Sequence, residues 1–284
     1  MLLSKERLSS DTMNRFVQLS RPIVVLMGVL FLFAAAFIAV GNSISSHLND
    51  LLFAVPVVIT FVVGGNSIND YSDRNTDIIS HPNRPIPSGR IAPQTALHIG
   101  IISLTIAAAF SLMLPNITAT CIVVVACLFI VMYELYLKKK GFLGNITIGV
   151  LTGMVLLLGG AVVSDVQNCY IVALMIFLIS LGQEIVSDIE DLAGDIDRNT
   201  LPKRFGIKNA RYIATASLIV AALLSIFPIL SGNTNTLYPS VIIADLLIFI
   251  AIYSIYKRPR NFQVLVISAM FMTVLSFLLG SVTV

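Results

Sequence analysis

Long apolar runs recur from one end of this chain to the other, and they constrain its fold more than any other feature. A helix needs about 20 mainly apolar residues to cross the roughly 30 Å hydrocarbon core of a bilayer, and this sequence contains many uncharged runs near that length. Of its 284 residues, 57% are hydrophobic and 12% are charged, and the mean hydropathy is +0.92. These values exclude an ordinary soluble domain. The sequence therefore predicts an all-α, polytopic membrane protein.

The apolar runs predict nine membrane spans. Their expected ranges are 22–40, 51–68, 96–114, 117–136, 142–163, 170–186, 212–230, 237–255 and 262–279. All 18 Lys and Arg residues lie before the first span or in every second connection after it. Because cytoplasmic connections are enriched in Lys and Arg, we expect the N-terminus in the cytoplasm and the C-terminus outside. One missed or invented span would destroy this alternation, so the charges favour nine.

The rest of the chain adds little to this organisation. The charged N-terminal stretch, residues 1–21, has no apolar core or cleavage site of a signal peptide, and we expect it to lie at the cytoplasmic interface of a single domain, 1–284. The three cysteines show neither zinc-site spacing nor a disulfide framework, which indicates structural roles.

Two acidic stretches follow apolar runs and share one spacing. They carry Asn66, Asp70, Asp73 and Asp77, and then Glu184, Asp188, Asp191 and Asp195. The 4, 3, 4 spacing in each places the four side chains on one face of a helix that leaves the membrane. The two sets are 118 residues apart, which resembles the trace of an internal repeat. Facing acidic groups repel each other unless cations neutralise them, so both faces are candidates for a functional site at the cytoplasmic rim.

Divalent cations that hold a phosphorylated substrate would explain these two faces. Mg²⁺ usually binds through one or two carboxylates plus substrate phosphates. Nearby basic groups could contact the same phosphates: Arg84 lies in a stiff loop rich in proline, and Lys138 follows Tyr136 at the inner end of the fourth span. Lys203 follows the second acidic stretch. We expect a diphosphate to bind between these groups, on the cytoplasmic side.

Other polar residues receive less specific expectations. Asp245 falls in the middle of the eighth predicted span, where a carboxylate is costly, so it must face a polar partner, and no role is assigned to it. His81 lies in the loop of the site, and a structural role is favoured for it. Gly149 and Gly153 have the spacing that lets membrane helices approach closely, which indicates packing.

These residues resemble the UbiA-type family of intramembrane prenyltransferases over essentially the whole chain. Residues 66–77 match the first Asp-rich motif of the family and residues 188–195 the second, and the runs NDYSDRNTD, NRPIPSGRI and EIVSDIEDLAGD…TLPKRFG occur in the expected order. Within the family, the motifs look most like those of the archaeal digeranylgeranylglyceryl phosphate synthases. The sequence departs from that pattern at Gln183, where an Arg is expected, and at Lys203 and Arg204, where apolar residues are commoner.

The resemblance implies nine helices around a central cavity that opens to the cytoplasmic side of the cell membrane. It implies transfer of a geranylgeranyl group from geranylgeranyl diphosphate to geranylgeranylglyceryl phosphate, with two Mg²⁺ ions, in archaeal ether-lipid biosynthesis. The implied metal ligands are Asn66, Asp70, Asp73 and Asp77 for one ion and Asp188, Asp191 and Asp195 for the other, with Asp70, Asp73, Asp191 and Asp195 as the catalytic carboxylates. The implied diphosphate contacts are Arg84, Tyr136, Lys138 and Lys203, and Arg21 would meet the phosphate of the acceptor. No nucleic acid or protein partner is expected.

Two alternatives remain open at this point. An aromatic prenyltransferase acting on a quinone precursor such as 4-hydroxybenzoate would use the same metal site. It would favour a carboxylate-binding Arg deep in the first span, and that span has no Arg after Arg21. A cation- or proton-coupled transporter would usually place its binding site near the membrane midplane, whereas most acidic groups here lie at one rim.

Overall fold

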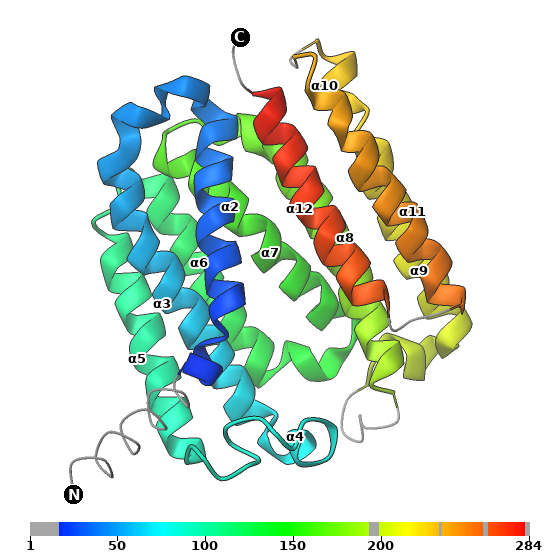
Figure 1. The fold of residues 1–284 in the computed structure, drawn as a ribbon. Helices are drawn as coiled ribbons and strands as arrows, with labels where there is room; N and C mark the ends of the chain where they lie inside the picture. The colour runs from blue at the N-terminus through cyan, green and yellow to red at the C-terminus, as the bar shows by residue number, and fades with distance from the viewer. Residues whose placement is uncertain (1–16, 193–198, 233–234, 258–260, 282–284) are drawn as a thin grey trace, which may run out of the picture.

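The computed structural model describes residues 17–192, 199–232, 235–257 and 261–281. Within these ranges the fold is a bundle of long helices that run up and down, with short helical turns at both ends (Figure 1). The long helices are α2 (Pro22–Val40), α3 (Leu48–Ser72), α5 (Pro93–Ser111), α6 (Ile117–Leu135), α7 (Phe142–Val162), α8 (Tyr170–Glu190), α9 (Leu201–Leu224), α11 (Val241–Lys257) and α12 (Phe262–Gly280). The short elements are η1 (Gly41–His47), α4 (Arg74–Ser80), η2 (Leu137–Lys140), η3 (Gln167–Cys169), α10 (Phe227–Leu230) and η4 (Tyr238–Ser240).

Eight segments of the described residues are long and apolar enough to cross a membrane. The longest, Pro22–Ser72, contains both α2 and α3, which η1 joins. Every predicted span overlaps a long helix, so the predicted all-α membrane fold is confirmed, although eight such segments do not by themselves establish nine crossings.

The surface of the bundle is apolar where a soluble protein would be polar. Large side chains such as Leu52, Ile102 and Val264 are more than half exposed, whereas alanines fill many of the helix contacts. This arrangement suits a protein whose solvent is lipid, because lipid tails favour apolar outer faces and small residues let helices approach.

Close helix contacts hold the elements that carry the acidic stretches. A methyl group at Gly153 of α7 would lie 2.9 Å from the carbonyl oxygen of Ala173 in α8, so the predicted packing role of Gly153 is confirmed. A methyl group at Gly159 would lie only 2.4 Å from the carbonyl oxygen of Leu32 in α2. Thus α7 lies in close contact with both α2 and α8.

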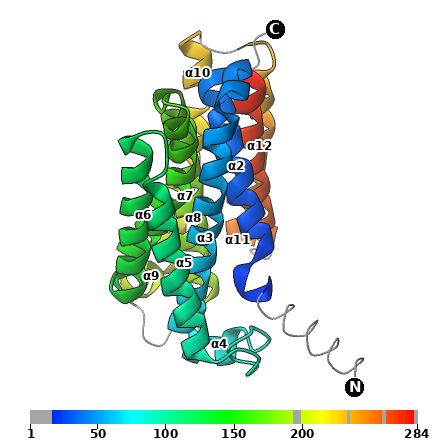
Figure 2. The ribbon, with the colours of Figure 1, turned by 90° about the vertical axis from the view of Figure 1, so that its left-hand side faces the viewer.

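Both acidic stretches lie at the same end of the bundle, opposite the end of α12 (Figures 1 and 2). We call this the acidic end. It contains α4, η2, the last turns of α3 and α8, and the first turn of α9. The sequence prediction that the two stretches share one depth is therefore consistent with the fold.

Asp245 lies inside an apolar segment, as the sequence predicts. It belongs to the second turn of α11, which begins at Val241 after η4, and it falls within the candidate span Tyr238–Lys257. One oxygen, Oδ2, accepts a hydrogen bond of 2.8 Å from Ser225 Oγ, whereas Oδ1 is buried and has no hydrogen-bond partner among the described residues. The polar partner that the sequence required is Ser225, the C-cap of α9.

Candidate active site

The first acidic stretch does not stay on one continuous helix, which corrects the prediction of a single face. The helix α3 ends at Ser72, Asp73 is its C-cap, and Asp77 belongs to α4. The run from Asn69 to Asp73 is polar and favours local side-chain bonds over helix. The guanidinium of Arg74 donates a 2.8 Å hydrogen bond to the Tyr71 carbonyl, which satisfies one of the open acceptors at the end of α3.

Asp70 lies in the last turn of α3 and is paired with Arg21. The distance from Arg21 Nη2 to Asp70 Oδ1 is 2.5 Å, and Asp70 is only 2% exposed. Arg21 has a left-handed backbone (φ 49°) immediately before Pro22, a conformation that is uncommon outside glycine and marks a constrained position. Asn66, one turn earlier in α3, donates to the Ser20 carbonyl at 3.2 Å. These bonds fix the segment that precedes α2 against the end of α3.

Asp77 is paired with Arg84. Arg84 Nη1 lies 2.9 Å from Asp77 Oδ1 and 2.7 Å from Oδ2, and Asp77 is 3% exposed. Arg84 belongs to the loop between α4 and α5, where Ser88 N donates to the Arg84 carbonyl and Ile91 N to that of Pro85. Prolines restrict the backbone of this loop, and the ion pair with Asp77 holds the guanidinium itself.

Asp73 belongs to a third cluster of charged and polar side chains, of which the sequence predicts only Asp73 and Lys138 as site residues. Lys138 Nζ lies 2.7 Å from Asp73 Oδ2 and 3.0 Å from Glu134 Oε2. Asn69 Nδ2 donates to the other oxygen of Glu134 at 2.9 Å. The side chains of Lys138 and Glu134 are 5% and 2% exposed, so this is a buried group of charges. Glu134 and Asn69 were missed, although a carboxylate inside an apolar span, four residues before Lys138, was the signal for Glu134.

The second acidic stretch reaches the same neighbourhood from the other side. Asn145, in the first turn of α7, donates to Asp188 Oδ2 at 2.9 Å, and Asn199 N donates to the Lys139 carbonyl at 3.3 Å. Asp191 is the C-cap of α8, whereas Asp195 lies outside the described residues. The segment 138–145 therefore contacts the first stretch through Lys138 and the second through Asn145. It is the structural link between the two stretches.

Gln183 and Ser187, near the start of the second stretch, are linked to α12 by hydrogen bonds. Gln183, where the sequence departs from the family pattern, donates to Gln263 Oε1 of α12 at 2.9 Å. Gln263 in turn donates to Ser187 Oγ at 2.9 Å. This polar chain ties the end of α8 to α12.

The remaining predicted phosphate contacts are less enclosed. Tyr136 is 64% exposed at the C-cap of α6, and Lys203 is exposed in the first turn of α9. Both lie at the acidic end, but unlike Arg84 and Lys138 they are not brought into the buried charge clusters.

The donor set suits a hard cation such as Mg²⁺. Within the described residues, no three His, Cys, Asp or Glu side chains lie close enough to hold a metal ion by themselves. Asp70, Asp73 and Asp77 instead offer single carboxylates next to Arg21, Lys138 and Arg84. Since Mg²⁺ usually takes one or two carboxylates and completes its shell with phosphate oxygens and water, these residues fit a site that a diphosphate completes.

Comparisons with known proteins find similar sequences and similar folds. Residues 28–278 match the model of the UbiA prenyltransferase family. The chain is 33% identical over 254 residues to the digeranylgeranylglyceryl phosphate synthase of Methanosphaera stadtmanae, covering 88% of this chain and 89% of that protein. It is 35% identical over 246 residues to the synthase of the same name from Methanothermobacter thermautotrophicus, covering 84% and 83%.

Two solved structures are also similar. One, described as digeranylgeranylglyceryl phosphate synthase in membranes, has a TM-score of 0.78 and 29% identity and covers 96% of this chain and 99% of its own. The other is a UbiA homolog from Archaeoglobus fulgidus bound to DMAPP and Mg²⁺, with a TM-score of 0.65 and 14% identity over 93% and 99% of the two chains. At that identity the second likeness shows the fold alone.

Proposed function

This chain belongs to the UbiA prenyltransferase family, and from that membership we propose that it transfers a geranylgeranyl group from geranylgeranyl diphosphate to geranylgeranylglyceryl phosphate. The observation that carries the proposal is the segment 138–145, which contacts both acidic stretches through Lys138 and Asn145. One bound diphosphate could then be reached from both stretches. We infer the acceptor from the product, digeranylgeranylglyceryl phosphate, that the names of the relatives and of the similar structure give.

The proposed reaction breaks the bond between the allylic carbon and the diphosphate oxygen, and the electron pair leaves with the diphosphate. Mg²⁺, when bound, would supply charge that stabilises this leaving group. We assign Asn66, Asp70, Asp73 and Asp77 to one ion and Asp188, Asp191 and Asp195 to a second.

The chain's own basic residues would stabilise the same negative charge. Arg84 and Lys138 already lie against the carboxylates of the first stretch, so each could shift its hydrogen bonds to phosphate oxygens without a large movement. We propose Tyr136 and Lys203 as further contacts of the diphosphate and Arg21 as a contact of the acceptor. The hydroxyl oxygen of the acceptor then forms the new ether bond to the allylic carbon, and its proton passes to the released diphosphate. The surrounding apolar helices would keep water away from the allylic cation.

We also propose a membrane topology for the chain. The chain is a multi-pass membrane protein, and we propose that α2 and α3 cross separately, which gives nine crossings around a cavity open to the acidic end. The distribution of Lys and Arg supports an orientation in which the acidic end and the N-terminus face the cytoplasm and the C-terminus faces outside. We propose that residues 1–284 form a single domain.

A product assay with two acceptors tests the proposed function. The purified full-length chain, with Mg²⁺ and geranylgeranyl diphosphate, would receive geranylgeranylglyceryl phosphate and 4-hydroxybenzoate side by side. We expect prenylation of the lipid alone. Prenylation of 4-hydroxybenzoate alone would keep the family and overturn the proposed acceptor.

A further inference from the structure

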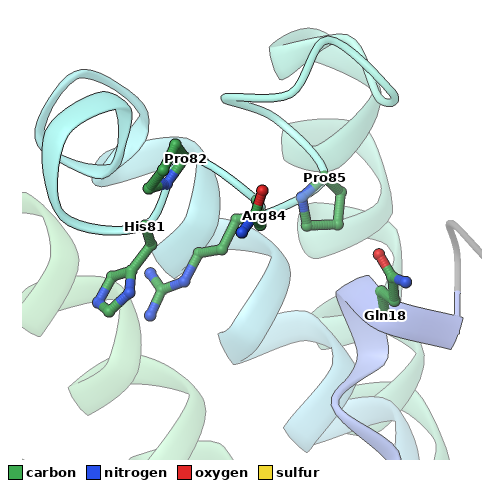
Figure 3. A pocket seen from close by; sticks show the side chains of 6 residues that line it. Gln18, His81, Pro82, Arg84 and Pro85 are labelled. Carbon is green, nitrogen blue, oxygen red and sulfur yellow. The ribbon is translucent and has the colours of Figure 1, made fainter.

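The loop between α4 and α5 forms one wall of a pocket of about 380 Å³ at the acidic end (Figure 3). Its lining residues are Gln18, His81, Pro82, Asn83, Arg84 and Pro85. We propose that this pocket binds the phosphate and glycerol oxygens of the acceptor lipid's headgroup. The proposal rests on the proposed function and adds a site for the acceptor beside the carboxylates.

The polar side chains that line the pocket can all donate hydrogen bonds, and no acidic residue is among them. Figure 3 places the His81 ring and the Arg84 guanidinium on one side of the pocket, with Gln18 on the other side beyond Pro85. The Gln18 Oε1 atom accepts a 2.6 Å hydrogen bond from Arg90 Nη1, which directs the amide oxygen toward Arg90 and leaves the two N–H donors of the amide for a ligand. Hydrogen-bond donors on two sides of a pocket suit an anion with several oxygen atoms.

Next to the pocket, Arg90 is bonded to two of the lining residues, Gln18 and Asn83, and no carboxylate of the described residues pairs with its positive charge. Arg90 donates to Ser88 Oγ at 2.8 Å, to Gln18 Oε1 and to the Asn83 carbonyl, all of which are neutral. Among the described residues Arg90 forms no ion pair, whereas the charge of Arg84 is offset by Asp77. A phosphate monoester, with a charge between about −1.5 and −2 near pH 7, complements this guanidinium. Since the three bonds already hold Arg90 in place, little ordering is needed when the anion binds.

The position of the pocket favours the acceptor over the prenyl diphosphate. Arg84 is shared: it lines the pocket and its Nη1 contacts Asp77, so the pocket adjoins the carboxylates on one side. Arg21 is held by Asp70, and Gln18 lies three residues before it in the same N-terminal segment. The polar side chains of the pocket therefore add hydrogen-bond donors for the acceptor's phosphate to the one that Arg21 provides. In a glyceryl phosphate the free hydroxyl is only a few bonds from phosphorus, so a phosphate bound here leaves the hydroxyl close to the proposed diphosphate site.

The test is an equilibrium binding measurement that does not depend on catalysis. Full-length protein in detergent micelles, without Mg²⁺ or diphosphate, would be titrated with labelled geranylgeranylglyceryl phosphate, alone and in competition with inorganic phosphate. A second titration would use geranylgeranylglycerol, which lacks the phosphate. The variants are His81→Ala and Gln18→Ala. The matched controls are His98→Ala and Gln94→Ala, which remove the same side chains from exposed positions on α5. Circular dichroism would verify the helix content of each variant.

We expect the wild type to bind the phosphorylated lipid at least about tenfold more tightly than the dephosphorylated one, which corresponds to about 1.4 kcal/mol. His81→Ala and Gln18→Ala should each reduce this preference several-fold, while both controls keep it within twofold. In the transfer assay the same variants should raise the KM for the acceptor and leave that for geranylgeranyl diphosphate unchanged.

Each contrary result overturns a different statement. Unchanged lipid binding in both variants would remove the pocket from the acceptor site. A raised KM for geranylgeranyl diphosphate alone would make the donor the occupant, and equal competition by inorganic phosphate would make the pocket a site for free phosphate. If the wild type transferred nothing while its lipid binding still depended on His81, the proposed function would fail and the headgroup site would stand.

Discussion

The buried charge cluster of Asp73, Lys138 and Glu134 allows a sharp prediction about stability. Lys138→Met keeps much of the side-chain volume but leaves two carboxylates near each other without their cation. Because the Lys138 and Glu134 side chains are 5% and 2% exposed, water screens this repulsion poorly. Removing one partner of a buried ion pair costs about 3–5 kcal/mol. We expect a loss at the lower end of that range, since Asn69 still donates to Glu134 and the Asp73 side chain is 15% exposed.

The companion variant Glu134→Gln should cost less. Lys138 would keep Asp73 as its partner, and only the charged bond to Glu134 would be lost, at about 1.5–3 kcal/mol. The double variant Glu134→Gln/Lys138→Met should be more stable than the sum of the two losses predicts, by about 0.5–3 kcal/mol, because Glu134→Gln removes a carboxylate whose cation Lys138→Met takes away.

The measurement is the free energy of unfolding from titration of the purified protein with SDS in mixed micelles. Far-ultraviolet circular dichroism is the appropriate signal, because the chain contains no Trp. Lys139→Met, at the exposed neighbouring lysine, is the matched control and should change the free energy by no more than about 0.5 kcal/mol. Strict additivity of the two single losses would refute the buried cluster as described.

Three further predictions concern other parts of the molecule. Arg84→Lys keeps a positive charge beside Asp77 but loses the planar fork, so the KM for geranylgeranyl diphosphate should rise about tenfold; an unchanged KM would remove Arg84 from the diphosphate site. Gly159→Ala should lower the free energy of unfolding by about 1–3 kcal/mol in the same SDS titration, because its methyl group would lie 2.4 Å from a carbonyl oxygen of α2, and an unchanged value would argue against that close approach. Asp245→Asn retains an acceptor for the Ser225 hydroxyl, so transfer activity should be unaffected; its loss would show that a carboxylate remote from the acidic end is needed.

Much of the fold could be predicted from the sequence because transfer of a helix into lipid depends on the composition of that helix alone. The ranges of α2 and α12 follow from this, as does the gathering of both acidic stretches at one end. The prediction of one acidic face over residues 66–77 was wrong because it extended the helical period through a polar run. The chain ends α3 at Ser72, where Arg74 satisfies the Tyr71 carbonyl.

The partners of the site residues could be predicted only in part. Repulsion among the carboxylates indicated that cations must be near, and the structure places Arg21, Lys138 and Arg84 beside them. Which cation meets which carboxylate depends on how α2, α3 and α6 pack, and no local pattern contains that information. Asn145 shows the same limit, because its bond to Asp188 joins residues 43 positions apart.

The most direct test of the central claim, that both acidic stretches act on one diphosphate, is the rate of diphosphate release from geranylgeranyl diphosphate in the presence of acceptor. The full-length wild type, Asp70→Asn and Asp188→Asn would be compared over a range of Mg²⁺ concentrations and after chelation with EDTA. We predict that EDTA abolishes release and that each substitution alone lowers the rate at least about 100-fold, equivalent to about 2.7 kcal/mol of transition-state stabilisation. Full Mg²⁺-dependent activity in either variant would contradict the account, because one stretch would then suffice.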